Sequence, residues 1–412
     1  MFTEILLFTL AGCGLGIITG LVPGIHINMV SALVLAGLPF FAGFETLSVA
    51  AMIMAMAVTH TFLDFIPSIL LGAPDGETAL AVLPGHTMLL EGRAIEAIKL
   101  TGLGSLMALL IAAGLFLVMV KWVGPVYEFI KPNLHFVLLF MILLGFAAEK
   151  NTWRAVFVFL AAGFFGFFVL GSAFPEGMIF PALSGMFGVS TMLLSLREKV
   201  RIPIQARANI NLKLGEIVRG SVVGSVAGML VGMLPGIGAA QATFVAQQVT
   251  RKSSVQEFLV AVSGVNTANM IFTMVVLYSL GKMRSGIMVV IDDMLGEMIF
   301  GQLLLFLGVI LLAGGVALFL HIKLGMFFAL KLSGGGSNYG KINVCIILVI
   351  TASVFALTGG IGLVVLLVGT ALGLLPPLLS VRRAECMGFL LFPVVLFYTG
   401  LYAIFAVFLG IV

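Results

Sequence analysis

Two stretches of this sequence share one pattern, Gly16-x-x-x-Gly20-x-x-Pro23-Gly24-Ile25 and Gly228-x-x-x-Gly232-x-x-Pro235-Gly236-Ile237. Matching positions lie 212 residues apart. The pair Phe180-Pro181 recurs as Phe392-Pro393 with the same displacement. One displacement shared by two separate regions indicates an internal duplication. We expect residues 1–196 to form the first transmembrane repeat, 197–214 a cytoplasmic linker and 215–412 the second repeat.

The composition excludes a soluble globular protein. Apolar residues make up 61% of the 412 residues and charged residues only 9%, against roughly 45–50% and about 25% in soluble domains. Apolar stretches long enough to cross a hydrocarbon core recur along the chain. Runs such as 103–120 do not alternate as the strands of a transmembrane barrel do. The sequence therefore predicts an all-α polytopic membrane protein, whose basic excess belongs to cytoplasmic loops and not to nucleic-acid binding.

Each half has the same predicted plan, a segment broken by Pro-Gly followed by five spans. The broken segments cover 5–43 and 215–249. The spans that follow them are 47–72, 96–120, 134–148, 153–171 and 178–196 in the first half and 255–280, 297–320, 342–358, 361–379 and 386–411 in the second. One helix over 215–249 would be about 50 Å long, beyond a core of roughly 30 Å. Basic residues at both of its ends, Arg219 and Arg251-Lys252, favour a re-entrant hairpin over two full spans.

If each hairpin enters and leaves on the same side of the membrane, each half crosses the membrane five times. Because this number is odd, the second half has the opposite orientation to the first. Seventeen of the 21 lysines and arginines then fall on the side of the central loop. The other side holds only Lys121, Lys131, Lys282 and Arg284. The positive-inside rule predicts a cell-membrane protein with both termini extracytoplasmic. Inverted repeats with broken helices are typical of secondary transporters, which bind substrate near the midplane.

Polar residues follow both breaks. Backbone N–H groups just after each Pro-Gly begin a new helical stretch, and with the positive end of its dipole they suit an anion. His26 fits equally well as a ligand or as a structural histidine. The residues that we predict to bind substrate here are Pro23, Gly24, Ile25, His26, Asn28, Pro235, Gly236, Gly238, Gln241 and Thr243.

A second polar group lies within the predicted spans. A carboxylate inside a span is costly and marks a functional site by default. His60 and Asp64 are four residues apart, so they share a helix face and can share a proton. They form either a coupling-ion site or a neutralising pair. Asn266 and Asn269 in the second half suit substrate or sodium, and equally hydrogen bonds between helices.

The stretch Pro67-Ser68-Ile69-Leu70-Leu71-Gly72-Ala73-Pro74-Asp75-Gly76-Glu77-Thr78-Ala79 continues through Leu83-Pro84-Gly85-His86-Thr87-Met88 to Glu91-Gly92-Arg93-Ala94. With the two Pro-Gly-Ile breaks, it resembles the large membrane subunit of the tripartite tricarboxylate transporters (TctA type), over roughly residues 10–290. The residues that match the family's loop are Pro74, Gly76, Thr78, Gly85, Met88 and Gly92. The family has Gly where this chain has His26, and this chain is short. Both departures indicate a divergent branch.

The resemblance implies a secondary active permease that moves a di- or tricarboxylate by alternating access, using a sodium or proton gradient. It also implies a small membrane subunit and an extracytoplasmic binding protein as partners, although a divergent branch is also compatible with transport without the binding protein. An oligomer is compatible with the sequence. Apart from the coupling ion no cofactor or metal is expected. One alternative is a polyprenyl-phosphate or other lipid-phosphate translocase. The other is an intramembrane enzyme that uses His60 and Asp64, although no nucleotide-binding or hydrolase motif is present.

Overall fold

The computed structural model describes residues 2–22, 27–72, 78, 82–147, 149–171, 177–197, 202–206, 212–234, 242–243, 254–333 and 339–408. Every regular element within these ranges is a helix, which confirms the predicted all-α class. Eight of the described helices are long and apolar enough to cross a membrane. Both Pro-Gly breaks lie outside the described residues, so the re-entrant hairpins stay predictions.

The first half contains helices that follow the predicted order. They are α1 (Phe2–Leu21), α2 (Ile27–Ala36), η1 (Leu38–Phe41), α3 (Thr46–Leu63), α4 (Phe65–Leu71), α5 (Val82–Leu90), α6 (Ala94–Ile130), η2 (Lys131–Asn133), α7 (Leu134–Ala147), α8 (Thr152–Leu170), α9 (Ile179–Leu183), the π-helical η3 (Ser184–Val189) and α10 (Ser190–Arg197). The predicted span 96–120 is thus part of a longer helix, α6. The predicted span 178–196 is interrupted by the π-helical turn.

The second half contains α11 (Leu214–Met233), α13 (Val255–Leu280), α14 (Gly286–Leu295), α15 (Phe300–Leu332), α16 (Tyr339–Leu379), η5 (Arg383–Met387), α17 (Gly388–Tyr398) and α18 (Tyr402–Phe408). The predicted spans 342–358 and 361–379 both lie in α16, with a kink at Gly359, whose φ of 66° suits glycine. The predicted span 386–411 is divided between α17 and α18.

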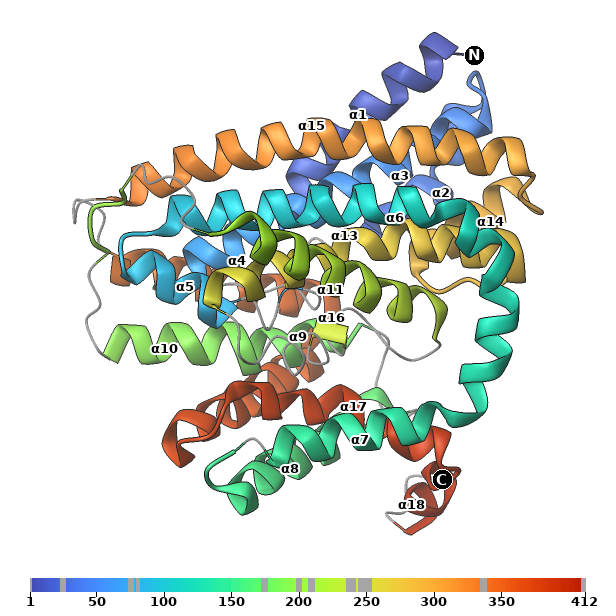
Figure 1. Cartoon of the computed structure of the whole chain (residues 1–412). Helices are drawn as coiled ribbons and strands as arrows, with labels where there is room; N and C mark the ends of the chain where they lie inside the picture. Colours follow the sequence, from blue (N-terminus) through green and yellow to red (C-terminus); the bar gives the residue numbers. More distant parts are fainter. Residues whose placement is uncertain are drawn as a thin grey trace.

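The helices pack into two bundles, one above the other in Figure 1. The upper bundle combines α1–α6 with α11 and α13–α15, and the lower bundle combines α7–α10 with α16–α18. Each bundle therefore contains helices from both halves of the sequence. The largest apolar core cluster includes side chains from both bundles.

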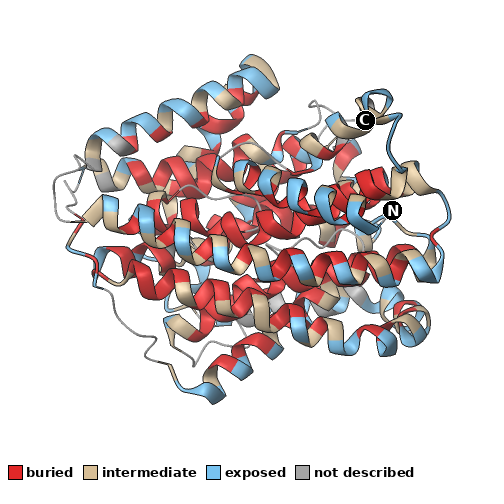
Figure 2. Ribbon diagram, turned by 90° about the horizontal axis from the view of Figure 1, so that it is seen from above, coloured by how far each residue is buried: buried red, intermediate tan, exposed pale blue. Residues whose placement is uncertain are grey.

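Two helices form the centre of the upper bundle. The membrane-length windows of α3 and α13 are entirely buried, and Figure 2 shows buried residues concentrated on the inner helices. α3 packs against α1 and α15, whereas α13 packs against α11 and α6. A helix that is apolar all round belongs in an interior position. Polar residues on α3 and α13 are therefore held away from lipid.

Glycines set how closely these helices approach. A Cβ on Gly16 of α1 would lie 2.8 Å from the Met56 carbonyl oxygen of α3, and a Cβ on Gly228 of α11 would lie 3.1 Å from the Ala268 Cβ of α13. The first distance is too short for a side chain, and so is the 2.7 Å that would separate a Cβ on Gly228 from the Val265 carbonyl oxygen, so glycine is needed in both contacts. Gly16 and Gly228 are 212 residues apart, and so are Met56 and Ala268.

Candidate functional site

Asp64 lies in a break between two helices. α3 ends at Leu63 and α4 begins at Phe65. Pro67 has no N–H to donate to the Leu63 carbonyl, and its ring crowds that oxygen, so the helical path is disturbed at Asp64, whose φ of −61° and ψ of −21° stay right-handed helical. The Ser68 hydroxyl instead donates to the Asp64 carbonyl oxygen at 2.9 Å. The Asp64 side chain is thereby fixed at the carboxyl end of α3, inside the protein.

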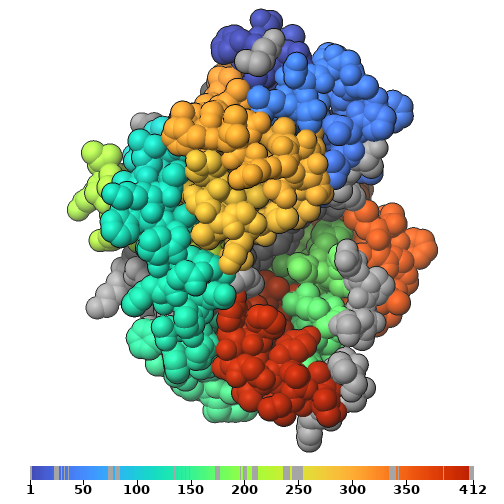
Figure 3. Space-filling view, turned by 90° about the vertical axis from the view of Figure 1, so that its right-hand side faces the viewer, coloured from blue at the N-terminus to red at the C-terminus, as the bar shows by residue number. Residues whose placement is uncertain are grey.

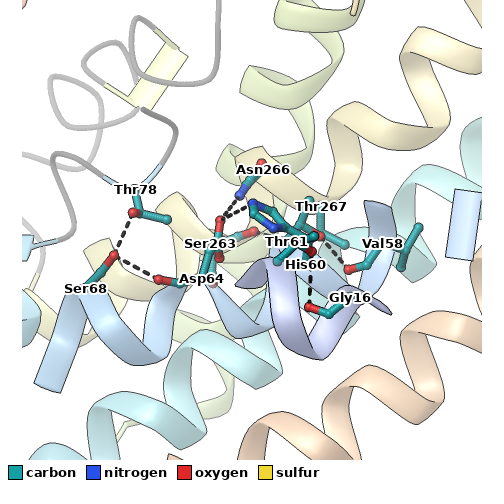
Figure 4. A network of polar contacts seen from close by, with 11 residues as sticks. Gly16, Val58, His60, Thr61, Asp64, Ser68, Thr78, Ser263, Asn266 and Thr267 are labelled. Carbon is teal, nitrogen blue, oxygen red and sulfur yellow. Dashed lines mark hydrogen bonds and ion pairs between the residues drawn. The ribbon is translucent and has the colours of Figure 1, made fainter. Parts of the chain in front are cut away.

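A carboxylate, an imidazole and an amide meet at this break (Figure 4). Asn266 Nδ2 of α13 donates to Asp64 Oδ2 at 2.9 Å. His60 Nε2 lies 4.0 Å from the same oxygen. His60 and Asp64 are each 2% exposed, and Asn266 is 1% exposed. The predicted proximity of His60 and Asp64 is confirmed, and the contact with Asn266 brings together residues 202 positions apart.

The same two helices, α3 and α13, carry further buried oxygen atoms. Thr61 Oγ1 of α3 lies 3.3 Å from Thr267 Oγ1 of α13. The Oδ1 atoms of Asn266 and Asn269 are buried and have no hydrogen-bond partner among the described residues. Carboxylate, hydroxyl and amide oxygens are ligands for hard cations such as sodium, while Asp64 and His60 can exchange a proton. The arrangement therefore suits a small cation or a proton.

The predicted substrate residues are only partly described. Asn28, near the start of α2, packs against α14, where a Cβ on Gly286 would lie 2.8 Å from Asn28 Cγ. Thr243 is buried, and its hydroxyl has no hydrogen-bond partner among the described residues. The others lie outside the described residues: Pro23, Gly24, Ile25, His26, Pro235, Gly236, Gly238 and Gln241.

The helix that leads into the first break ends beside Asp64. A Cβ on Gly20, in the last turn of α1, would lie 3.3 Å from the Asp64 backbone nitrogen. Pro23 follows three residues later. The matching turn of α11 places Gly232 against α13, where a Cβ would lie 3.0 Å from the Thr273 backbone nitrogen. Each break therefore begins within a few residues of a central helix.

The residues of the family-motif loop hold a short helical hairpin together. Thr78 Oγ1 lies 2.6 Å from Ser68 Oγ of α4, so this loop residue contacts the Asp64 break through one hydroxyl. Gly85 of α5 faces Ile69 of α4, and a Cβ there would lie 2.8 Å from Ile69 Cγ1. Met88 is 1% exposed. Pro74 and Gly76 lie outside the described residues.

Gly92 and the linker between the halves form a second contact that sequence reasoning missed. Gly92 has a φ of 79°, and its carbonyl accepts from the Ala206 N–H at 2.9 Å. The buried Gln205 side chain accepts from the Ala94 N–H at 2.9 Å and donates to the Leu89 carbonyl at 3.0 Å. The linker segment 202–206 thus closes the ends of α5 and α6. Nothing in the sequence pattern of this segment, Ile202-Pro203-Ile204-Gln205-Ala206, indicated which distant residues it contacts.

His321 is another buried polar residue that sequence reasoning missed. It lies in α15 with no exposed surface, and its Nε2 is 3.1 Å from Thr101 Oγ1 and 2.9 Å from the Ile98 carbonyl oxygen of α6. Gly102 makes room for the ring, because a Cβ there would lie 2.9 Å from His321 Cδ2. A histidine within a long apolar span was the signal that could have found it.

Comparisons with known proteins place the chain in a family. The sequence model of the tripartite tricarboxylate transporter TctA family matches residues 6–388. An uncharacterized protein of Methanocaldococcus jannaschii is 31% identical over 288 residues, which are 68% of this chain and 71% of that protein. No solved structure matches the chain.

Proposed function

The chain belongs to the tripartite tricarboxylate transporter TctA family, and from this membership we propose that it moves a small di- or tricarboxylate across the cell membrane. The movement is driven by a sodium or proton gradient and proceeds by alternating access. The observation that carries the coupling part of the proposal is the Asp64 carboxylate, buried between α3 and α13 and bound by Asn266. A carboxylate buried within a span is costly and is a functional-site hypothesis by default.

Asp64 is the proposed site of the coupling ion. It lies at the junction of α3 and α4, within one apolar helical stretch, Thr46–Leu71, where an ionisable side chain is a functional-site hypothesis by default. A bound cation or proton neutralises the carboxylate and lowers the cost of its burial. His60 supports the proton form, and the oxygens of Thr61, Thr267 and Asn266 support the sodium form.

The anionic substrate is proposed to bind to the backbone amides that follow the two breaks. The first break begins near Asp64, since Gly20 packs against the Asp64 backbone. A cation bound at Asp64 therefore lies close to the proposed anion, and each raises the affinity of the other. The fluxes of cation and substrate are coupled by this attraction. The anionic substrate binds poorly when no cation or proton neutralises the Asp64 carboxylate.

Alternating access is proposed to use the two halves as inverted repeats. The packing pairs Gly16–Met56 and Gly228–Ala268 share the displacement of 212 residues that relates the two breaks. The helices also exchange partners reciprocally, because α3 packs on α15 of the other half and α13 packs on α6. Reciprocal packing supports a pseudo-two-fold relation, although it does not by itself fix the axis in the membrane plane.

Uptake into proteoliposomes tests the function. The purified protein is offered labelled citrate, succinate and phosphate under separate sodium and proton gradients, with and without its predicted small membrane subunit and binding protein. We expect accumulation of a carboxylate under one of the two gradients. Movement of a lipid phosphate instead would favour the translocase alternative. Turnover in detergent without any gradient would favour the enzyme.

A further inference from the structure

Three cations gather around Tyr127 near the end of α6. Lys282 Nζ donates to the Tyr127 hydroxyl at 3.1 Å and lies 4.2 Å from the ring centroid. The Arg284 guanidinium carbon lies 5.3 Å from this centroid and Lys131 Nζ lies 5.7 Å from it. Tyr127 is only 2% exposed. The end of α6 and the turn between α13 and α14 therefore bring three positive charges to one aromatic ring.

In the described part of the chain, no carboxylate is paired with these charges. Arg284 Nε and Nη2 are buried and have no hydrogen-bond partner within the described chain. The aromatic ring attracts each cation but removes none of the charge, and the cations repel one another. Three other arginines form ion pairs, Arg93 with Glu96, Arg219 with Glu257 and Arg382 with Glu149, whereas Arg154 donates to the Leu379 carbonyl and Arg383 to hydroxyl groups.

The cluster adjoins the chain that leads to the predicted substrate site. Arg284 precedes Gly286 by two residues, and Gly286 packs against Asn28, which follows the first break. Figure 3 shows the teal segment and the gold segment side by side on this face. Together with Lys121, the three cations are the basic residues of the face predicted to be extracytoplasmic.

We propose that Lys131, Lys282 and Arg284 form an anion-capture site, which receives the di- or tricarboxylate before it reaches the midplane. The inference rests on the proposed function. Several cations without carboxylate partners complement a ligand with two or three carboxylates. Arg284 offers the planar donors that bind a carboxylate, and the lysines offer mobile charges. Such a cluster raises the local concentration of an anion, and its effect falls as salt screens it.

Uptake kinetics test the site directly. The double variant Lys282→Gln/Arg284→Gln should raise KM for citrate about tenfold at low ionic strength with Vmax unchanged. The difference should shrink in high salt. Arg284→Lys keeps the charge and should keep a near-normal KM. Lys121→Gln is the matched control, because Lys121 lies over Trp122, at 5.8 Å from its ring centroid. An unchanged KM in a folded double variant would overturn the proposal.

A reaction that needs no transport separates this inference from the proposed function. Met283, which is 44% exposed between two of the cations, is changed to Cys in a Cys345→Ser background, since Cys13 and Cys386 are buried. The introduced cysteine should react faster with an anionic thiosulfonate than with a cationic one, and citrate should slow the reaction with the anionic reagent. The Lys282→Gln/Arg284→Gln variant should lower the ratio of the anionic to the cationic reaction rate about tenfold. If this ratio of reaction rates is the same with and without the two glutamine substitutions, the capture site is refuted even if uptake is observed.

The lipid composition distinguishes the carboxylate from a lipid headgroup. The kinetics and the thiol reaction are first run in phosphatidylcholine vesicles, which carry no net negative charge. We expect the full effect of the cations there. An effect that appears only after phosphatidylglycerol is added would assign the cluster to lipid phosphate and overturn the proposal.

Discussion

At the scale of single residues, the buried polar group of Asp64, His60 and Asn266 carries the functional argument. Asp64 is the residue between α3 and α4. Pro67, in the first turn of α4, removes the backbone hydrogen bond to Leu63 and so separates the two helices there. Asn266 donates to the Asp64 carboxylate from a helix in the other half of the chain. A proline-induced break and a side chain from a distant segment thus create a site that neither half holds alone.

Replacement of Asn266 tests how this carboxylate is held. Asn266→Leu removes the donor to Asp64, and we expect a loss of about 1–3 kcal/mol in the free energy of unfolding together with weaker dependence of uptake on the coupling ion. Thermal unfolding measures the loss of stability, and uptake at graded sodium concentration and pH measures the dependence on the coupling ion. Thr273→Val, on the same helix, should cost about 1 kcal/mol or less and leave the ion dependence unchanged, because the Thr273 hydroxyl donates to backbone carbonyls of α13. Equal effects of the two variants would argue against a special role for Asn266.

The glycines of the sequence pattern divide into two kinds. Gly24→Val and Gly236→Val should abolish uptake while the protein stays folded, because a branched side chain crowds the amides proposed to bind the substrate. Gly16→Val should instead lower expression and thermal stability, since its Cβ would meet α3 at 2.5 Å from the Thr59 Cβ. Substrate binding and unfolding temperature are measured for each variant. A well-folded Gly236→Val protein with full substrate affinity contradicts the site assignment.

At the scale of elements, the linker between the halves is a packed part of the structure. Gln205 joins the start of α6 to the end of α5 through its amide group, and its backbone N–H donates to Ser333 Oγ at 2.8 Å. Gln205→Ala should lower the free energy of unfolding by about 1–3 kcal/mol, because the buried Ala94 N–H loses its acceptor. Chemical denaturation measures it. Ile204→Ala is the control, since Ile204 is 77% exposed; a comparable loss there would contradict this reading.

The sequence allowed the helical class, the long apolar helices and the His60–Asp64 proximity to be predicted. Those features depend on local composition and on spacing along one helix. The contact between Asp64 and Asn266 could not be predicted, because it depends on how α3 crosses α13. The packed linker also escaped prediction, since the contacts of Gln205 are made with distant segments. The division of 386–411 into α17 and α18 was missed because apolar composition alone does not locate a helix end.

At the scale of the whole molecule, the two bundles and the reciprocal helix packing bear on the inverted-repeat proposal. Both halves contribute helices to each bundle, so relative movement of the bundles would involve both repeats. The proposed pseudo-two-fold axis brings the two Pro-Gly breaks together near the midplane. Ile25→Cys/Ile237→Cys should therefore form an intramolecular crosslink with a short bifunctional reagent. Ile25→Cys/Ile204→Cys, which pairs one break with the exposed linker, should not. A crosslink between positions 25 and 204, with none between positions 25 and 237, would contradict the inverted repeat.

The most direct test of the account is gradient-driven accumulation of citrate by Asp64→Asn in proteoliposomes, measured beside citrate binding to the same protein. The asparagine keeps the size of the side chain but cannot take up a proton and coordinates a cation more weakly. We predict that the native protein accumulates citrate under a sodium or proton gradient. Asp64→Asn should bind citrate with largely unchanged affinity but fail to accumulate it. Accumulation by Asp64→Asn at the native level would contradict the account and leave His60 and Asp64 with structural roles.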